Sequence, residues 1–222
     1  MDNYLKLLLI RHGESMGNKA GRFEGQSSTP LSDQGQWQAS QLAKYLKHQF
    51  PPTRIYSSPL QRAVETANYL ESVTQCPVQL EKALQELHQG ILQGLTWAEA
   101  NERYPDMCAA LVATLDYQPI PGAETLMAAH HRAIDWYRTL WQRHETGDVV
   151  WMVTHGGFMQ YLISAILGCD RSWQIPIRHT ALFEFWLLSP KLTDQHNPEH
   201  WRIMKFNETP HLGNKIEVVK AL

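Results

Sequence analysis

The segment at residues 148–154 (DVVWMVT) constrains the fold most, because its interior is continuously apolar and rich in β-branched residues. A strand of this kind is typical of the centre of a parallel sheet, where both faces are buried. A second apolar run, residues 5–10 (LKLLLI), ends at Arg11 and has the same character. The two runs predict a sheet that is covered by helices on both faces.

The rest of the chain alternates between helical and strand patterns. Further strands are predicted at 54–57, 77–80, 180–188 and 201–206. Helices are predicted at about 33–50, 59–73, 124–144 and 158–167, with two more between 86 and 116, and residues 11–30 are expected to form a loop. Strands that alternate with helices favour an α/β fold, and we predict three α/β/α layers around a mostly parallel central sheet. We interpret the chain as a single domain over residues 1–222, into which residues 87–121 insert a small helical cap.

The charge balance and the cysteines exclude several classes of protein. The chain has 20 Lys and Arg against 22 Asp and Glu, so no general basic surface is available for nucleic acid. Cys76, Cys108 and Cys169 lie far apart, which argues against a disulfide framework or a thiolate zinc site. No apolar stretch reaches membrane-spanning length. We therefore expect a cytoplasmic protein that binds neither nucleic acid nor membrane.

A histidine followed by glycine occurs at the ends of two predicted strands, at His12 and at His155. Ligands of open α/β sheets bind where the strands end, and glycine lets the backbone approach an anion closely. Arg62 falls in the first turn of the helix after the 54–57 strand, where free N–H groups favour anions. These positions together predict a phosphate-binding site.

Four motifs resemble those of the histidine phosphatase superfamily, the phosphoglycerate mutase-like family. R-H-G-E-S-x-x-N stands at 11–18, S-S-P-L-x-R-A-x-x-T-A at 57–67, E-x-H-x-G at 86–90, and His-Gly at 155–156. The resemblance implies a phosphoglycerate mutase-like fold. It also implies a phosphohistidine intermediate on His12, with Arg11, Arg62 and His155 around the phosphoryl group. Glu86 would protonate the leaving oxygen and then activate water.

The same resemblance implies a set of substrate-binding residues and no cofactor. We expect substrate contacts from Asn18, Gly156, Arg22 and Gln26. The scheme requires no metal ion, and the sequence contains neither a C-x5-R thiol-phosphatase loop nor a D-x-D-x-[TV] motif.

Three functions fit these residues: a phosphatase, a cofactor-dependent phosphoglycerate mutase, and a non-catalytic phosphoryl-binding module. A binding module would be expected to lack His12 or Glu86, and both are present. Residues 87–130 contain one cation, Arg103, whereas the related mutases carry extra Lys and Arg there and have Asn in place of Gly157. These differences favour hydrolysis of small phosphorylated metabolites, with the mutase as the alternative. We expect broad specificity or an uncharged organic portion in the substrate. The physiological substrate is not determined by the sequence, and a homodimer is open beside a monomer.

Overall fold

The strand predicted at 148–154 lies inside a six-stranded sheet in the computed structural model, which describes residues 4–49, 51–171, 173–188 and 198–213. This strand is β4 (Val149–Thr154), and it pairs in parallel with β1 (Leu5–Arg11) on one side and β2 (Arg54–Ser57) on the other. The remaining strands are β3 (Val78–Leu80), β5 (Leu182–Leu187) and β6 (Trp201–Glu208). The order across the sheet is β3-β2-β4-β1-β5-β6.

One strand runs against the others. β5 is antiparallel to β1, and β6 is antiparallel to β5, whereas β1, β2, β3 and β4 are mutually parallel. The predicted mostly parallel α/β sheet is therefore confirmed. The reversal has a consequence for the site: the segment just before β5 starts at the edge where β1 ends, and the Arg11 N–H donates to the Ala181 carbonyl at 3.2 Å.

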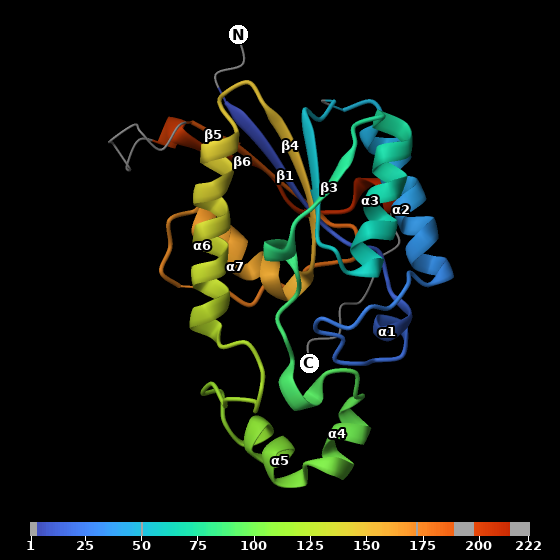
Figure 1. The fold of residues 1–222 in the computed structure, drawn as a ribbon, viewed down its shortest axis with the longest axis vertical. Coiled ribbons are helices and arrows are strands. Elements are labelled where there is room, and N and C mark those ends of the chain that lie inside the picture. Colours follow the sequence, from blue (N-terminus) through green and yellow to red (C-terminus); the bar gives the residue numbers. More distant parts are fainter. Residues whose placement is uncertain (1–3, 50, 172, 189–197, 214–222) are drawn as a thin grey trace.

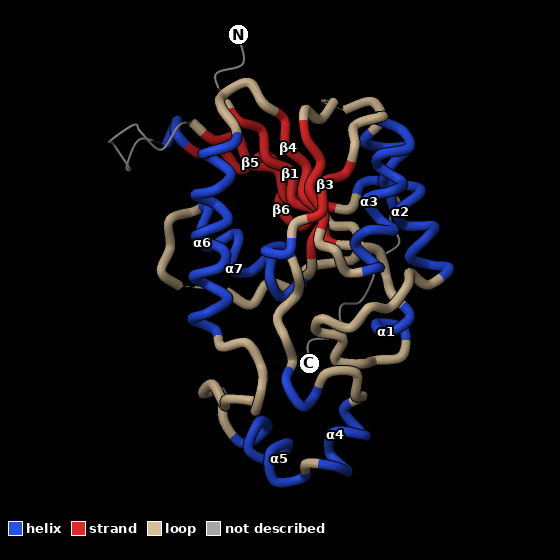
Figure 2. Tube along the Cα trace, in the orientation of Figure 1, coloured by secondary structure: helices blue, strands red, loops and turns tan. Residues whose placement is uncertain are grey.

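Helices cover both faces of the sheet, as Figures 1 and 2 show. α6 (Leu126–Arg143) and α7 (Gly156–Ile166) pack together on one face, and α2 (Asp33–Leu46) and α3 (Gln61–Thr74) pack on the other. Each face has its own apolar core, because alternate strand residues point to opposite sides. No helix among the described residues is long and apolar enough to cross a bilayer.

The helix boundaries differ from the predictions in three places. α2 is capped by Ser32, as predicted, but ends at Leu46 instead of near residue 50, which is outside the described residues. The predicted loop at 11–30 contains a short helix, α1 (Met16–Lys19), because Ser15 and Asn18 form a capping box. The two helices predicted between residues 86 and 116 are present, but they begin only at Trp97, after Gly90 and Gly94, whose φ values are 54° and 84°.

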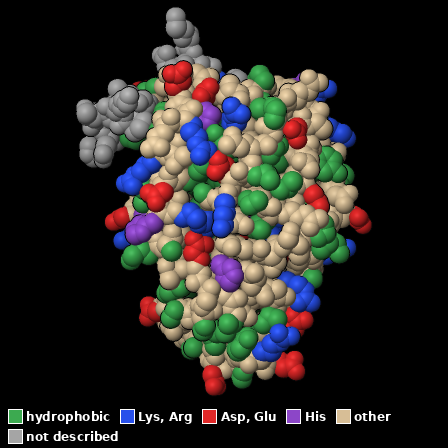
Figure 3. Space-filling model, in the orientation of Figure 1, with side chains coloured by type: hydrophobic (Ala, Val, Ile, Leu, Met, Phe, Trp, Pro, Cys, Tyr) green, Lys and Arg blue, Asp and Glu red, His purple; other side chains and the backbone are tan. Residues whose placement is uncertain are grey.

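The segment predicted as a cap folds at the end of the sheet where β1 and β4 finish (Figures 1 and 2). It contains α4 (Trp97–Arg103) and α5 (Pro105–Ala113), which break at Pro105 as expected. They enclose a small apolar cluster that is separate from the two sheet cores and consists of Leu92, Leu95, Ala100 and Cys108. Apolar side chains also gather on the outside at this end of the molecule (Figure 3).

The parallel register fixes where the catalytic motifs meet. Arg11 and Thr154 are direct partners in the β1–β4 ladder, and the His12 N–H donates to the Thr154 carbonyl at 3.0 Å. On the other side of β4, the Ser58 N–H donates to the Val153 carbonyl at 2.9 Å. The segments that carry His12, Ser58 and His155 therefore leave the sheet at one level.

We expect Thr154→Val to destabilise the fold by about 1–3 kcal/mol, the cost of leaving a buried acceptor without its donor. The buried Thr154 hydroxyl donates to the Leu84 carbonyl at 2.7 Å and so ties the chain before Glu86 to β4. Urea denaturation would measure the loss. The matched control is Thr139→Val, which removes a similar hydroxyl-to-carbonyl bond on the exposed side of α6 and should cost under about 0.5 kcal/mol. Equal losses in both variants would contradict the prediction.

Candidate active site

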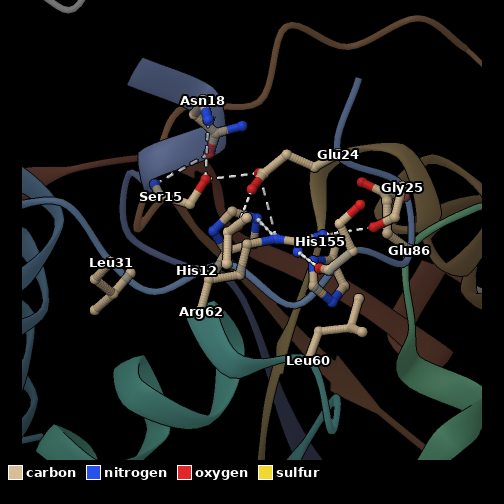
Figure 4. Close-up of polar contacts among 12 residues, drawn as sticks. His12, Ser15, Asn18, Glu24, Gly25, Leu31, Leu60, Arg62, Glu86 and His155 are labelled. Carbon is tan, nitrogen blue, oxygen red and sulfur yellow. Dashed lines mark hydrogen bonds and ion pairs between the residues drawn. The ribbon is translucent and has the colours of Figure 1, made fainter. Parts of the chain in front are cut away.

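Two histidines from neighbouring strand ends form the centre of the site. His12 and His155 are 2% and 0% exposed, and their ring centroids are 4.9 Å apart. Figure 4 shows the two rings beside the Arg62 side chain, which comes from the first turn of α3. The predicted meeting of these three residues is thus present in the structure.

The hydrogen bonds of His12 define its tautomer. Nδ1 lies 2.7 Å from the Gly13 carbonyl, which can only accept, so Nδ1 carries the proton. Nε2 accepts from the Arg62 Nε–H at 3.2 Å and therefore presents a lone pair. Burial holds the pKa of His12 well below its usual value, and the nearby Arg62, His155 and Arg11 lower it further. The imidazole is consequently neutral and nucleophilic at neutral pH.

Arg62 is held by groups that the motifs did not identify. Its guanidinium is 1% exposed and donates to the carbonyls of Ser27 at 2.7 Å and Gly25 at 2.8 Å. Its Nε lies 3.5 Å from a carboxylate oxygen of Glu24 (Figure 4). Burial lowers the pKa of Arg62 and the Glu24 charge opposes this effect.

Glu24 is a buried carboxylate that the sequence analysis missed. It accepts from the Ser15 hydroxyl at 2.6 Å and from the Thr29 hydroxyl. Gly17 makes room for it, since a Cβ at that position would lie 2.3 Å from a Glu24 oxygen. Glu24 belongs to none of the four motifs, and an isolated Glu in a loop carries no signal of burial.

His155 is fixed at one nitrogen and open at the other. Its Nε2 lies 2.7 Å from the Ser58 hydroxyl, whereas its buried Nδ1 meets no hydrogen-bond partner within the described part of the chain. Burial lowers the pKa of His155 well below its usual value, helped by the charges of Arg62 and Arg11. An unsatisfied buried ring nitrogen is costly unless a ligand binds it.

Arg11 lies next to the glycine that follows His155. One guanidinium nitrogen donates to the Ile177 carbonyl at 2.5 Å, which fastens the segment before β5 to β1. A Cβ on Gly156 would lie 3.2 Å from the Arg11 Nε, so the absence of a side chain at 156 lets the guanidinium pack there.

The carboxylate of Glu86 lies at the N-terminus of α7, although the residue itself belongs to a loop far from this helix in the sequence. One carboxylate oxygen accepts from the Phe158 N–H at 2.8 Å and from the Leu87 N–H at 3.0 Å, and the other accepts from the Gly157 N–H at 3.0 Å. Free N–H groups at a helix start favour a negative charge, so these bonds fit the ionised carboxylate. A Cβ at Gly157 would be 2.5 Å from a Glu86 oxygen, so this arrangement requires glycine at 157.

The predicted substrate-binding residues have different surroundings. Gln26 donates to the Glu86 carbonyl at 3.0 Å and so lies beside the site. Arg22 instead joins the loop to the cap, through bonds to Glu99 and the Gly94 carbonyl that are each 2.7 Å long. Substrate binding by Asn18, Gly156, Arg22 and Gln26 stays a prediction.

A third imidazole, from His179, lies near His12 and was also missed. The ring centroids of His12 and His179 are 6.2 Å apart, and the His179 Nε2 is 3.1 Å from the Asn18 Oδ1. The residue stands in the segment just before β5, outside the four motifs. The reversed direction of β5 brings this segment to the site, and no sequence motif predicts that reversal.

These groups can bind an anion and present a neutral nucleophile to it. Two guanidiniums and two imidazoles surround the unprotonated Nε2 of His12, which suits a tetrahedral phosphoryl group. In the described ranges, no three His, Cys, Asp or Glu side chains gather in a way that could hold a metal ion.

Acidification should destabilise the protein through its buried neutral histidines. Burial lowers the pKa of His211 to about 4, while the unfolded chain binds this proton near pH 6.5. The stability that the neutral His211 contributes is therefore fully present above pH 6.5. It is lost as the pH falls from 6.5 towards 4, by about 1.4 kcal/mol per pH unit for each such histidine. Urea denaturation between pH 7.5 and 5 measures the slope. His211→Gln should make the slope shallower, and His131→Gln, at an exposed position of α6, should not; an unchanged slope in His211→Gln contradicts the prediction.

Comparisons with known proteins agree with this geometry. The chain is 36% identical over 157 residues to a metal-independent phosphoserine phosphatase of Arabidopsis thaliana, and the match covers 70% of this chain and 66%, just under two thirds, of that protein. It is 30% identical to phosphoserine phosphatase 1 of Hydrogenobacter thermophilus, over 98% of this chain and 100% of that protein. The solved structure of a mycobacterial glucosyl-3-phosphoglycerate phosphatase is 26% identical, with a TM-score of 0.73 over 92% of this chain and 99% of that chain.

The family assignment rests on nearly the whole chain. Residues 7–208 match the histidine phosphatase superfamily (branch 1). This range contains all four motifs, the strands β2 to β6 in full, and β1 from its third residue. The sequence-based resemblance is therefore confirmed, and this chain belongs to the histidine phosphatase superfamily.

Proposed function

We propose that this protein is a metal-independent phosphatase that hydrolyses small phosphomonoesters through a phosphohistidine on Nε2 of His12. One observation carries the proposal: the His12 Nδ1–H donates to the Gly13 carbonyl, so Nε2 carries no proton and directs its lone pair into a cationic pocket. The names of the relatives, which are phosphatases, support hydrolysis. We also propose that the protein is cytoplasmic.

In the first step, the Nε2 of His12 attacks phosphorus and the bond to the leaving oxygen breaks. Arg11 and Arg62 stabilise the charge on the phosphoryl oxygens, and the open Nδ1 of His155 donates or accepts there according to its protonation. A protonated Glu86 gives its proton to the leaving oxygen. The resulting carboxylate is the form that the N–H groups of α7 hold in this structure.

In the second step, water attacks the phosphohistidine. The Glu86 carboxylate accepts a proton from that water, which releases inorganic phosphate and regenerates neutral His12. Because the acid of the first step is the base of the second, the position of one carboxylate controls both. Gly157 supports this role, since it leaves the space that the Glu86 carboxylate occupies.

A pocket beside Glu86 supports a charged organic portion in the substrate. It has a volume of ≈ 450 Å³ and is lined by residues that include Lys82, Arg132, Gln26 and Glu124. Lys82 and Arg132 lie just outside residues 87–130, the range in which Arg103 is the single cation. Arg132 pairs with Glu124 at 2.8 Å, and Lys82 supplies a further cation that suits a substrate carboxylate. Phosphoserine is therefore our first candidate, as the relatives' names also suggest.

Phosphoserine should release phosphate in the presence of EDTA, and His12→Ala should abolish the release because no neighbouring group can replace the imidazole. Malachite-green detection measures phosphate, and His131→Ala is the control for a histidine outside the site. Labelled substrate should give a phosphoenzyme that is lost in acid but survives alkali. An acid-stable phosphoenzyme would exclude the mechanism, and isomerisation of 3-phosphoglycerate that outpaces phosphate release would favour the mutase alternative.

Gly157→Ala should lower kcat/KM by about ten- to a hundredfold while the unfolding midpoint changes little, because the new Cβ displaces only the end of the Glu86 side chain. Glu86→Gln should lower the rate on alkyl phosphates far more than on p-nitrophenyl phosphate, whose leaving group needs no proton. In the double variant Gly157→Ala/Glu86→Gln, the two losses of kcat/KM should not add, since both act through the Glu86 carboxylate. Fully additive losses would separate Gly157 from Glu86.

A further inference from the structure

Thr180 is the one β-branched residue with a positive φ in the described part of the chain, at 56°. This conformation is strained in a residue other than glycine, and it persists where the surrounding contacts hold it in place. Thr180 is fully buried and directly follows His179. The strain therefore lies in the backbone that directs the third imidazole toward His12.

Three contacts hold Thr180 in this conformation. Its N–H donates to the His12 carbonyl at 3.3 Å, and its hydroxyl donates to the His179 carbonyl at 2.7 Å. Since the hydroxyl proton is used, the Thr180 oxygen accepts from the Nε2–H of His211 at 2.8 Å. We call these contacts of Thr180 with His12, His179 and His211 the Thr180 clamp.

The side chain of His179 is oriented as well as its backbone. The Oδ1 of Asn18 accepts from the Ser15 N–H at 3.3 Å, which identifies that atom as oxygen, so the His179 Nε2 at 3.1 Å must carry a proton. The ring centroid then lies 6.2 Å from that of His12, and the charge of His179 contributes to the lowered pKa of the nucleophile.

We propose that His179 is a further phosphoryl-binding residue, which contacts the oxygens of the transferring group, and that the Thr180 clamp positions it. The inference rests on the proposed function and extends it to a side chain outside the four motifs. The backbone strain is explained by this role, because a relaxed Thr180 would turn the preceding imidazole away from His12. Because the Nε2 proton of His179 is directed at Asn18, the ring would contact a phosphoryl oxygen as the protonated imidazole, through its Nδ1–H.

The test measures the Kd of inorganic phosphate by calorimetry, which requires no turnover, together with kcat/KM for phosphoserine. His179→Ala should raise Kd and lower kcat/KM by about tenfold or more, as expected for the loss of one phosphoryl contact. His131→Ala, on the exposed face of α6, is the matched control and should change neither.

Two further variants separate direct contact from an effect through Asn18. If His179 only orients Asn18, the double variant Asn18→Ala/His179→Ala will bind phosphate no more weakly than Asn18→Ala alone, and the proposal is overturned. A further loss of about tenfold in the double variant supports direct contact. His179→Asn shortens the side chain but keeps a donor. It should reverse less than half of the increase in log Kd that His179→Ala causes. A Kd equal to that of the wild type would show that the imidazole is unnecessary.

The clamp is tested at Thr180 itself. Thr180→Gly accepts the positive φ but loses the bond from His211, so Kd should rise severalfold, whereas Thr180→Ser keeps the hydroxyl and should stay within about twofold of wild type. Equal Kd values in the two variants would remove the clamp from the proposal. Wild-type protein that binds phosphate without hydrolysing phosphoserine would contradict the proposed function, but the effect of His179→Ala on Kd would still decide this inference.

Discussion

The alignment of β1 with β4 is the constraint on which the rest of the site depends. One backbone hydrogen bond, from the His12 N–H to the Thr154 carbonyl, places the two histidine–glycine turns side by side. Because the ladder is parallel and buried on both faces, a register slip would move every apolar side chain to the wrong face. The two apolar cores of the sheet therefore also fix the separation of His12 and His155.

Such a site concentrates positive charge where solvation is poor, and the structure offsets this cost with main-chain oxygens. Arg62 donates to the Gly25 and Ser27 carbonyls, Arg11 to the Ile177 carbonyl, and Glu24 supplies the nearest buried negative charge to Arg62. The histidines respond differently to the same environment. Burial and neighbouring cations keep His12 and His155 neutral, which is the protonation state that a nucleophilic imidazole needs.

The sequence predicted the parts of the site that depend on local pattern. The apolar strands, the glycines after His12 and His155, and the position of Arg62 in the first turn of α3 follow from a few adjacent residues each. Glu24 and His179 could not be predicted this way. Glu24 is buried because Gly17 leaves room for it and the Ser15 hydroxyl donates to it, contacts that depend on the folding of the loop. His179 reaches the site because β5 runs against β1, which depends on distant parts of the chain. The residue at which the two cap helices begin could not be predicted either, because it depends on two glycines with positive φ that precede Trp97.

The two sides of the pocket are built from different kinds of element, and this suits a two-step reaction. His12, His155 and Arg62 stand on strand ends and on the first turn of a core helix, so the phosphoryl group meets a fixed set of donors in both steps. Glu86 lies in a loop, and its carboxylate accepts hydrogen bonds from N–H groups of α7 and of its own neighbour Leu87. A carboxyl group that must first release a proton and later accept one needs such adjustable contacts, because protonation weakens its hold on N–H donors. The glycine at 157 leaves the carboxylate room at this helix start, and the fixed histidine side keeps phosphorus in place while the acid changes its charge.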